Sequence, residues 1–171
     1  MSAFSEALQA DGPSPELGDA AGVYGWLIGS WEADVIDHEE NGSRHLSQGE
    51  WHFTWALEGR AIQDVWISPS RAGRAGAPKV RNRYGTTLRV YDPSLGAWRI
   101  TWINPVSGAH NQLIGRKEGD DLVQDGRLED GSLIRWSFRE ITPTSFRWLG
   151  ERSTDEGRTW RLDAEFQVRR V

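Results

Sequence analysis

Short runs of alternating apolar and polar residues fill the chain from residue 26 onward. Such alternation is typical of strands that bury one face, and a helical period never lasts long enough here to predict a helix. Turn residues separate the runs, at Asn41-Gly42, Glu58-Gly59, Asp92-Pro93 with Gly96, Ser107-Gly108, Gly119-Asp120, Asp130-Gly131, Thr142-Pro143 and Glu156-Gly157. The pattern predicts an all-β fold, a single antiparallel up-and-down β-barrel of about ten strands.

The first 22 residues are polar, small and proline-containing, and they carry one helix start at Ser14-Pro15-Glu16. Serine is a good N-cap, and proline fits the first helical position. A short helix that begins here and ends near Tyr24 would close one mouth of the barrel. We therefore expect a flexible N-terminal segment at 1–22, with a short helix or coil as a cap, and one barrel domain at 23–171.

The two ends of the β region carry residues that suit a barrel floor. Trp31 follows Gly29-Ser30 in the first long strand, and Arg169 and Arg170 lie at the end of the last one. An arginine stacked on a tryptophan combines cation–π attraction with the exclusion of water. We expect Trp31 to lie across the floor of the barrel, with an arginine from the final strand stacked on it.

The sequence leaves open which face of the strand at 51–55 points inward. His52 and Thr54 point to one face and form a polar set. Trp51, Phe53 and Trp55 point to the other face and form an aromatic set. A two-residue turn at Asn41-Gly42 pairs Trp31 with the polar set, so the aromatic set would form an outer patch for a second subunit. One β-bulge, naturally at Gly49, reverses this assignment. We favour the bulge, because a barrel of this size needs large side chains inside.

Length and charge limit the class of protein further. A chain of 171 residues fits one domain, and its net charge of −5 is spread along the sequence without a basic stretch. Binding to nucleic acid or to an anionic membrane surface is therefore disfavoured. The absence of cysteine excludes disulfides, zinc-thiolate sites and a thiol nucleophile. Because we find no signal peptide and no apolar span, we expect a cytoplasmic location.

Ten tryptophans are the unusual feature of the composition. Tryptophans pack a thin core or line a pocket for flat, apolar ligands. On the hairpin around Asp92-Pro93, aromatic residues share one face with arginine and asparagine, which is typical of a cavity wall, while Leu88, Val90 and Ile103 on the other face are the alternative core. The candidate ligand-binding residues are Trp55, Gln63, Trp66, Tyr84, Arg89, Trp102, Asn104 and His110.

Few residues indicate catalysis or metal binding. The catalytic candidates are Asp64, whose pKa burial would raise toward acid–base use, and His110, which begins a strand near a cavity mouth. His45 and His52 are an odd number of residues apart, so they point to opposite faces of a regular strand, and we expect no metal site. No nucleophile elbow, phosphate loop or dinucleotide fingerprint occurs. We therefore expect no cofactor.

Four groups of residues follow one another along the chain in a characteristic order. They are Trp26-Leu27-Ile28-Gly29-Ser30-Trp31-Glu32, Trp55-Ala56-Leu57-Glu58-Gly59-Arg60, Tyr91-Asp92-Pro93, and residues 153–161 followed by Arg169-Arg170-Val171. Together they resemble the bacterial lipocalin-like domains of unknown function in the calycin superfamily, over 26–171. The resemblance implies a fatty-acid-binding-protein-like barrel with an internal pocket, and no established reaction. Nitrobindin-like haem barrels need a histidine near the chain end, whereas the last histidine here is His110, so haem is disfavoured.

Residues 68–79, from Ser68 to Lys79, form a long connection between two predicted strands. They are too rich in glycine, alanine and proline to pack, and they are long for a hairpin connection. One interpretation is a disordered surface loop. The other is a mobile basic lid that admits an anionic ligand at the barrel mouth.

Three hypotheses for function remain. The leading one is a barrel that binds a small, largely apolar ligand, aromatic or acyl, between tryptophan side chains. The second is a cofactor-free isomerase, cyclase or hydratase that acts on a secondary metabolite, with Asp64 or His110 as acid or base. The third is a filled structural or interaction barrel that forms a homodimer through the aromatic set. They differ in whether the barrel has a free interior and in where its aromatic residues point.

Overall fold

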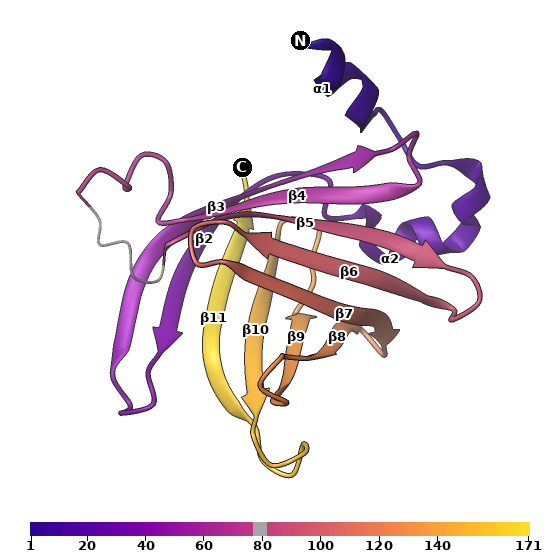
Figure 1. Cartoon of the computed structure of the whole chain (residues 1–171). Coiled ribbons are helices and arrows are strands. Elements are labelled where there is room, and N and C mark those ends of the chain that lie inside the picture. The colour runs from indigo at the N-terminus through magenta and orange to yellow at the C-terminus, as the bar shows by residue number, and fades with distance from the viewer. Residues whose placement is uncertain (77–81) are drawn as a thin grey trace.

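The computed structural model describes residues 1–76 and 82–171, with short helices first and strands afterwards (Figure 1). The N-terminal elements are α1 (Ala3–Leu8), β1 (Gln9–Ala10), the 3-10 helix η1 (Pro15–Ala20) and α2 (Ala21–Gly25). The long strands are β2 (Gly29–His38), β3 (Arg44–Ala56), β4 (Ala61–Ser68), β5 (Arg83–Asp92), β6 (Ala97–Asn104), β7 (Ala109–Glu118), β8 (Asp121–Arg127), β9 (Leu133–Arg139), β10 (Ser145–Ser153) and β11 (Arg161–Arg170). None of the helices in the described part of the chain is long and apolar enough to cross a membrane.

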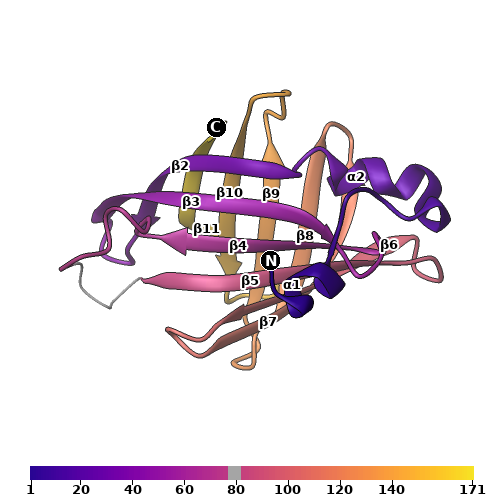
Figure 2. The ribbon, with the colours of Figure 1, turned by 90° about the horizontal axis from the view of Figure 1, so that it is seen from above.

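Within the described residues, the ten strands from β2 to β11 close into an antiparallel barrel. Each strand pairs with its neighbours in sequence, and β11 pairs with β2 to complete the ring, with Arg170 opposite Trp31. Figure 2 shows the strands of the two walls crossing, with α2 at one end. The short strand β1 adds to β3. The prediction of an all-β, up-and-down barrel with a short N-terminal helix is confirmed.

The register of β2 and β3 decides which side chains enter the barrel. Trp31 lies opposite Trp51, and the pairing continues without a shift along the whole of β2. The aromatic set at 51–55 is therefore buried inside, while the polar set lies on the outer face. The alternative in which the aromatic set forms an outer patch for a second subunit is wrong, because those side chains fill the interior.

The length of a turn, and not a bulge, produces this register. The N–H of Glu39 donates to the carbonyl of Ser43 at 2.9 Å, and Gly42 has a φ of 85°. A three-residue loop of this kind ends on a residue with positive φ, and it shifts the pairing by one residue relative to a two-residue turn. The expected bulge at Gly49 is therefore wrong. Gly49 instead makes room for the indole of Trp66, with which a Cβ at this position would collide.

The end of the barrel next to α2 is closed by the predicted floor. The guanidinium carbon of Arg170 lies 4.0 Å from the ring centroid of Trp31. N–H groups of this guanidinium donate to the carbonyl oxygens of Ile28 at 2.9 Å and Trp26 at 2.7 Å. The indole of Trp31 donates to the carbonyl of Leu27 at 2.7 Å. The predicted tryptophan floor with a stacked arginine is confirmed.

The first 22 residues carry the helix start that the sequence predicts. The hydroxyl of Ser14 accepts from the N–H of Glu16 at 3.3 Å, and Pro15 occupies the first turn of η1. The N–H of Ser14 also donates to the carbonyl of Gly59 at 2.9 Å, which ties the segment to the turn between β3 and β4. The expected boundary between residues 22 and 23 falls inside α2. The flexibility of 1–22 stays a prediction.

Candidate ligand-binding cavity

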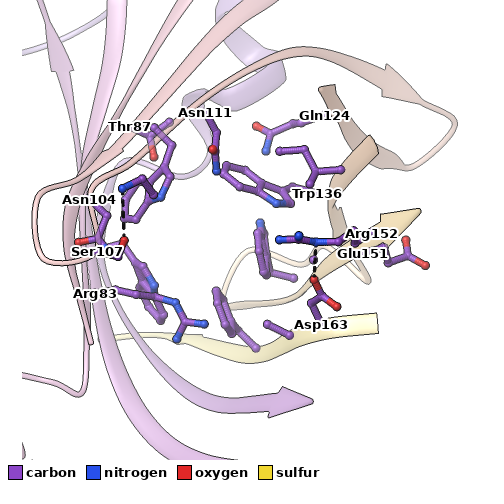
Figure 3. Close-up of a pocket in the computed structure, with 18 of the residues that line it drawn as sticks. Arg83, Thr87, Asn104, Ser107, Asn111, Gln124, Trp136, Glu151, Arg152 and Asp163 are labelled. Carbon is purple, nitrogen blue, oxygen red and sulfur yellow. Dashed lines mark hydrogen bonds and ion pairs between the residues drawn. The ribbon is translucent and has the colours of Figure 1, made fainter. Parts of the chain in front are cut away.

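The barrel contains a cavity of about 290 Å³ on the side away from the floor (Figure 3). Ser107, in the turn between β6 and β7, and Leu128, which follows β8, border it at the end of the barrel where β2 ends. Its wall comes from alternate positions of the strands, such as Arg83, Thr87 and Arg89 on β5, because successive side chains in a strand point to opposite faces.

One side of the cavity is a row of aromatic rings. Trp66 and Phe166 stack with ring centroids 4.6 Å apart, and Phe166 and Trp148 stack at 4.4 Å with an angle of 11° between the planes. Trp136 continues the row at 5.8 Å from Trp148. Gly150 permits this packing, because a Cβ there would come within 2.8 Å of the ring of Trp148. The row gives this side of the cavity an apolar, aromatic lining.

A buried ion pair supports the inner part of the lining. Arg89, which lines the cavity, donates to a carboxylate oxygen of Asp64 at 2.6 Å, and the backbone N–H of Thr87 donates to the other oxygen at 3.1 Å. Burial raises the pKa of Asp64, and the positive charge of Arg89 opposes that rise. The rings of Tyr24 and Phe53 lie 5.5 Å from the guanidinium carbon. The pair therefore fixes Arg89 among aromatic rings.

A second buried polar side chain, Gln124 on β8, meets the cap helix. Tyr24 lies in α2, and its hydroxyl donates to the amide oxygen of Gln124 at 3.1 Å. Burial raises the pKa of Tyr24, so this hydroxyl keeps its proton. Gly115 on the neighbouring strand leaves the space, because a Cβ there would collide with the hydroxyl. The amide nitrogen of Gln124 has no hydrogen-bond partner among the described residues.

Polar side chains near the mouth are paired with one another or with the backbone. Arg83 donates to the carboxylate of Asp37, with one of the two contacts at 3.2 Å. Arg152 donates to Asp163 at 3.2 Å, as drawn in Figure 3. Asn104 binds backbone groups at the adjacent strand ends. The two arginines that line this part of the cavity therefore have carboxylate partners.

Four of the residues expected to bind a ligand do line the cavity, namely Trp66, Arg89, Trp102 and Asn104. Arg89, Trp102 and Asn104 lie on the face of the hairpin that was interpreted as a cavity wall, and whether they bind a ligand stays a prediction. The alternative core face lies outside, where Val90 and Ile103 are exposed. Arg89 pairs with Ile100 across β5 and β6 and both point inward, so Val90 and Ile103 point outward.

The other four candidates do not line the cavity. Trp55 is buried at the floor side, where its ring packs against Gly25 of α2. Gln63, Tyr84 and His110 point outward, since each occupies the position next to an inward-facing residue. Gln63 donates to the hydroxyl of Thr86 at 3.0 Å on that outer face.

Sequence reasoning missed Gln124, Asn111, Trp136 and Arg152, all of which line the cavity. Figure 3 shows the amides of Asn111 and Gln124 directed toward the cavity. Gln124 pairs with Trp136 across β8 and β9, so the two side chains share the inner face of the barrel. No register was predicted through the turn at Asp130-Gly131. The backbone bond from Leu128 to Ser132 encloses three residues there, and this turn length sets the pairing.

Neither catalytic candidate contacts the cavity. Asp64 lies in its ion pair with Arg89, on the far side of that side chain from the lining. His110 is exposed on the outer face of β7. An acid or base must come within about 3 Å of the reacting atom, directly or through one water. Their positions thus give no support to acid–base chemistry in this cavity.

His38 and His52 lie in polar contacts outside the cavity. The ring of His52 bonds the hydroxyl of Ser30 at 2.9 Å and the carboxylate of Glu50 at 3.0 Å. His38 approaches Glu165 at 3.4 Å. Among residues 1–76 and 82–171, no group of three or more His, Cys, Asp or Glu side chains is arranged to hold a metal ion.

The described part of the connection between β4 and β5 lies along the outside of β3. Arg71 donates to Glu50 at 2.9 and 2.8 Å, and the N–H of Ser70 donates to the carbonyl of Gln48 at 2.7 Å. The hydrogen bonds from Arg71 lower the pKa of Glu50 to about 2. Residues 68–76 contribute nothing to the cavity lining. Lys79 lies outside the described residues, and both interpretations of the connection stay predictions.

By its fold, the chain is a lipocalin-like barrel with an internal cavity. It aligns over 89% of its length with 92% of the S-type phycobiliprotein lyase CPES from Guillardia theta, with a TM-score of 0.59 and 11% identity. It aligns over 90% of its length with 98% of Rv2717c from M. tuberculosis, with a TM-score of 0.59 and 14% identity. At these identities the likeness establishes the shared barrel fold alone. No protein-family model and no curated protein matches the chain.

Proposed function

We propose that the barrel binds one small, flat and largely apolar ligand, aromatic or acyl, in its cavity. The observation that carries the proposal is the row of rings from Trp66 to Trp136 beside an open volume of about 290 Å³. Pockets for small molecules are concave and mostly apolar, and they contain a few polar groups that orient the ligand. The cavity has this composition.

The volume of the cavity limits the size of the ligand. An apolar cavity of about 150 Å³ accommodates one benzene molecule. A volume of about 290 Å³ therefore suits two fused aromatic rings or an acyl chain of similar size. Contacts between aromatic rings add about 0.5–1.5 kcal/mol each beyond the burial of area. This term favours an aromatic ligand over an acyl chain.

Equilibrium dialysis tests the proposal with a two-ring hydrocarbon, 2-isopropenylnaphthalene, and with 1-decanol as the chain analogue. We expect saturable binding of the naphthalene at one molecule per chain, and weaker binding of the alcohol. Native mass spectrometry of the gently purified protein, compared with the denatured chain, shows in parallel whether a ligand is retained. Failure of both compounds to bind would contradict the proposal.

A pair of variants on β7 locates the binding site. Ala109 lines the cavity, so Ala109→Phe puts a ring into it, and we expect at least a tenfold loss of affinity for 2-isopropenylnaphthalene. His110 points outward from the next position, so His110→Phe adds the same ring to the outer surface. This control is expected to bind as the unmodified protein does. Equal effects of the two changes would mean that the compound binds elsewhere.

A further inference from the structure

The polar atoms left without partners at the cavity are all donors. Arg89 and Gln124 both line it, are 1% and 0% exposed, and leave the guanidinium Nε and the amide nitrogen, respectively, without a hydrogen bond in the described part of the protein. The indole nitrogens of Trp51 and Trp66 are two further such atoms. A buried donor without a partner costs about 1–3 kcal/mol, so native proteins pair nearly all of them. Together these atoms indicate a ligand that brings an acceptor.

The orientation of Gln124 follows from its contact with Tyr24. The buried tyrosine hydroxyl keeps its proton and donates to the amide oxygen, at 3.1 Å. The NH₂ group is therefore the part of the amide that is left for a ligand. The guanidinium of Arg89 also lies over the ring of Tyr24, 5.5 Å from its centroid. Both donors thus lie at the inner end of the cavity, beside the cap helix.

The charges around the cavity decide which kind of acceptor fits. Asp64 holds Arg89 at 2.6 Å, and the two arginines nearer the mouth have their own carboxylates, Arg83 with Asp37 and Arg152 with Asp163. A buried anion needs a positive charge that is not already balanced. These arginines offer none. An uncharged acceptor takes the free N–H groups without this desolvation cost.

We infer that the inner end of the cavity binds an uncharged carbonyl oxygen through Gln124 and Arg89. The ligand class is then flat aromatic ketones, quinones and lactones of about two fused rings, which enter with the carbonyl toward α2 while the rings lie along the aromatic row. The inference rests on the proposed function and adds to it the polar group and the direction of entry.

Three probes of nearly equal shape test the inference by equilibrium dialysis. They are 2-acetylnaphthalene, 2-isopropenylnaphthalene, which replaces the carbonyl oxygen by CH₂, and 2-naphthoate, which is anionic. We expect the ketone to bind at least tenfold more tightly than either of the others, because a buried donor pair rejects an analogue that leaves it unpartnered. Equal binding of ketone and hydrocarbon would overturn the inference and leave the proposed function standing. Tightest binding of 2-naphthoate would overturn the uncharged acceptor, and binding of none would overturn both proposals.

Variants assign the effect to the inner donor. Gln124→Leu is expected to lower the affinity for 2-acetylnaphthalene about fivefold and to leave that for the hydrocarbon unchanged. The carbonyl stretching band of the bound ketone is expected to lie at lower frequency in the unmodified protein than in the variant. Gln63→Leu is the matched control, since Gln63 bonds Thr86 outside the cavity. An unchanged ketone affinity and band in Gln124→Leu would contradict the assignment.

A second variant covers the case in which Gln124→Leu fails to fold, because that change leaves the hydroxyl of Tyr24 without its acceptor. The double variant Tyr24→Phe with Gln124→Leu removes both partners, which is close to neutral for stability in buried pairs. Its ketone affinity is expected to fall about fivefold as well, with the affinity for the hydrocarbon unchanged. A double variant that folds and still prefers the ketone tenfold would overturn the role of Gln124.

Discussion

The closed and open ends of the barrel use aromatic residues in different ways. At the closed end, Trp26 and Trp31 meet Phe146 edge to face, with ring centroids 5.3 and 4.9 Å apart. At the open end, Phe166 stacks on Trp66 and on Trp148, with ring centroids 4.6 and 4.4 Å apart. The edge-to-face contacts fill the closed end, whereas the stacked rings at the open end border the cavity. The same residue types therefore build a plug at one end and a cavity wall at the other.

The indole nitrogens show the physical origin of this difference. Those of Trp26 and Trp31 donate to the carbonyls of Val23 and Leu27, which lie in and just after α2. The last carbonyls of a helix have no partner in the helix itself, so they are available as acceptors. Inside a closed sheet the backbone carbonyls already belong to the ladder. Trp31 also lies on a strand, but near its start and close to α2, whereas the indole of Trp66 on β4 finds no acceptor among the described residues.

The largest expected effect on stability comes from comparing a tryptophan of the closed end with one of the cavity wall. Trp31→Ala removes a fully buried ring and the surface on which Arg170 stacks, so we expect the free energy of unfolding to fall by about 5 kcal/mol. Trp136→Ala removes a half-buried ring from the cavity wall, and we expect a loss of about 1–2 kcal/mol. Urea denaturation measures both. Similar losses would mean that the two ends do not differ as the packing indicates.

The buried pair between the two ends gives a smaller and asymmetric effect. Asp64→Ala leaves the buried guanidinium of Arg89 unbalanced, and arginine cannot lose its proton, so we expect a loss of about 3 kcal/mol. Arg89→Met leaves Asp64, which can take up a proton, and the loss is expected to be smaller.

The pH dependence of Arg89→Met sharpens this test. Burial raises the pKa of Asp64, and the variant lacks the positive charge that opposes the rise. The folded state then binds the proton more tightly than the unfolded state does, so stability is full at low pH and falls as the pH rises through the folded pKa. Urea denaturation is expected to give a more stable variant at pH 5 than at pH 8. The opposite order would contradict the assignment of Asp64 as the titrating group.

The smallest effect lies on the outer wall, away from both ends. The folded-state pKa of Glu50 is about 2, well below its ordinary value of 4.5, because Arg71 donates hydrogen bonds to its carboxylate. This stabilisation is present above pH 4.5 and is lost as the pH falls toward 2. Arg71 is 61% exposed, so solvent screening reduces the contribution to about 1 kcal/mol.

Glu50→Gln tests this contribution by acid titration of the free energy of unfolding. We expect a loss of about 1 kcal/mol at pH 7 and a flatter decline between pH 4.5 and 2. High salt is expected to reduce the difference from the unmodified protein, because exposed charges are screened. A difference that does not depend on salt would mean that Glu50 and Arg71 behave as a buried ion pair, as Asp64 and Arg89 do.

Local chemistry made the fold predictable. The turn at Glu58-Gly59 needs a positive φ, which both residues adopt, and Ser14 caps η1 as its side chain suggests. The floor was predictable as well, because Trp31 and Arg170 stand at the two ends of the β region. Such features depend on a few neighbouring residues or on the order of strands.

Parts of the candidate site could not be predicted, because a cavity joins strands whose register the sequence does not state. The turns at Asn41-Gly42 and Asp130-Gly131 both enclose three residues, and the first was interpreted as a two-residue turn. No register was predicted through the second turn, so Gln124 was missed. For the first, a bulge was invoked to obtain the inward face that the longer turn provides.

The sequence by itself determined the class of fold, the positions of the turns and the plug at the closed end, since alternation, glycine conformations and capping act over short distances. Only the tertiary structure decided which side chains share the cavity and which donors stay free there. The physical reason is the two-residue period of a strand. A change of one residue in a turn moves every side chain of the following strand to the opposite face.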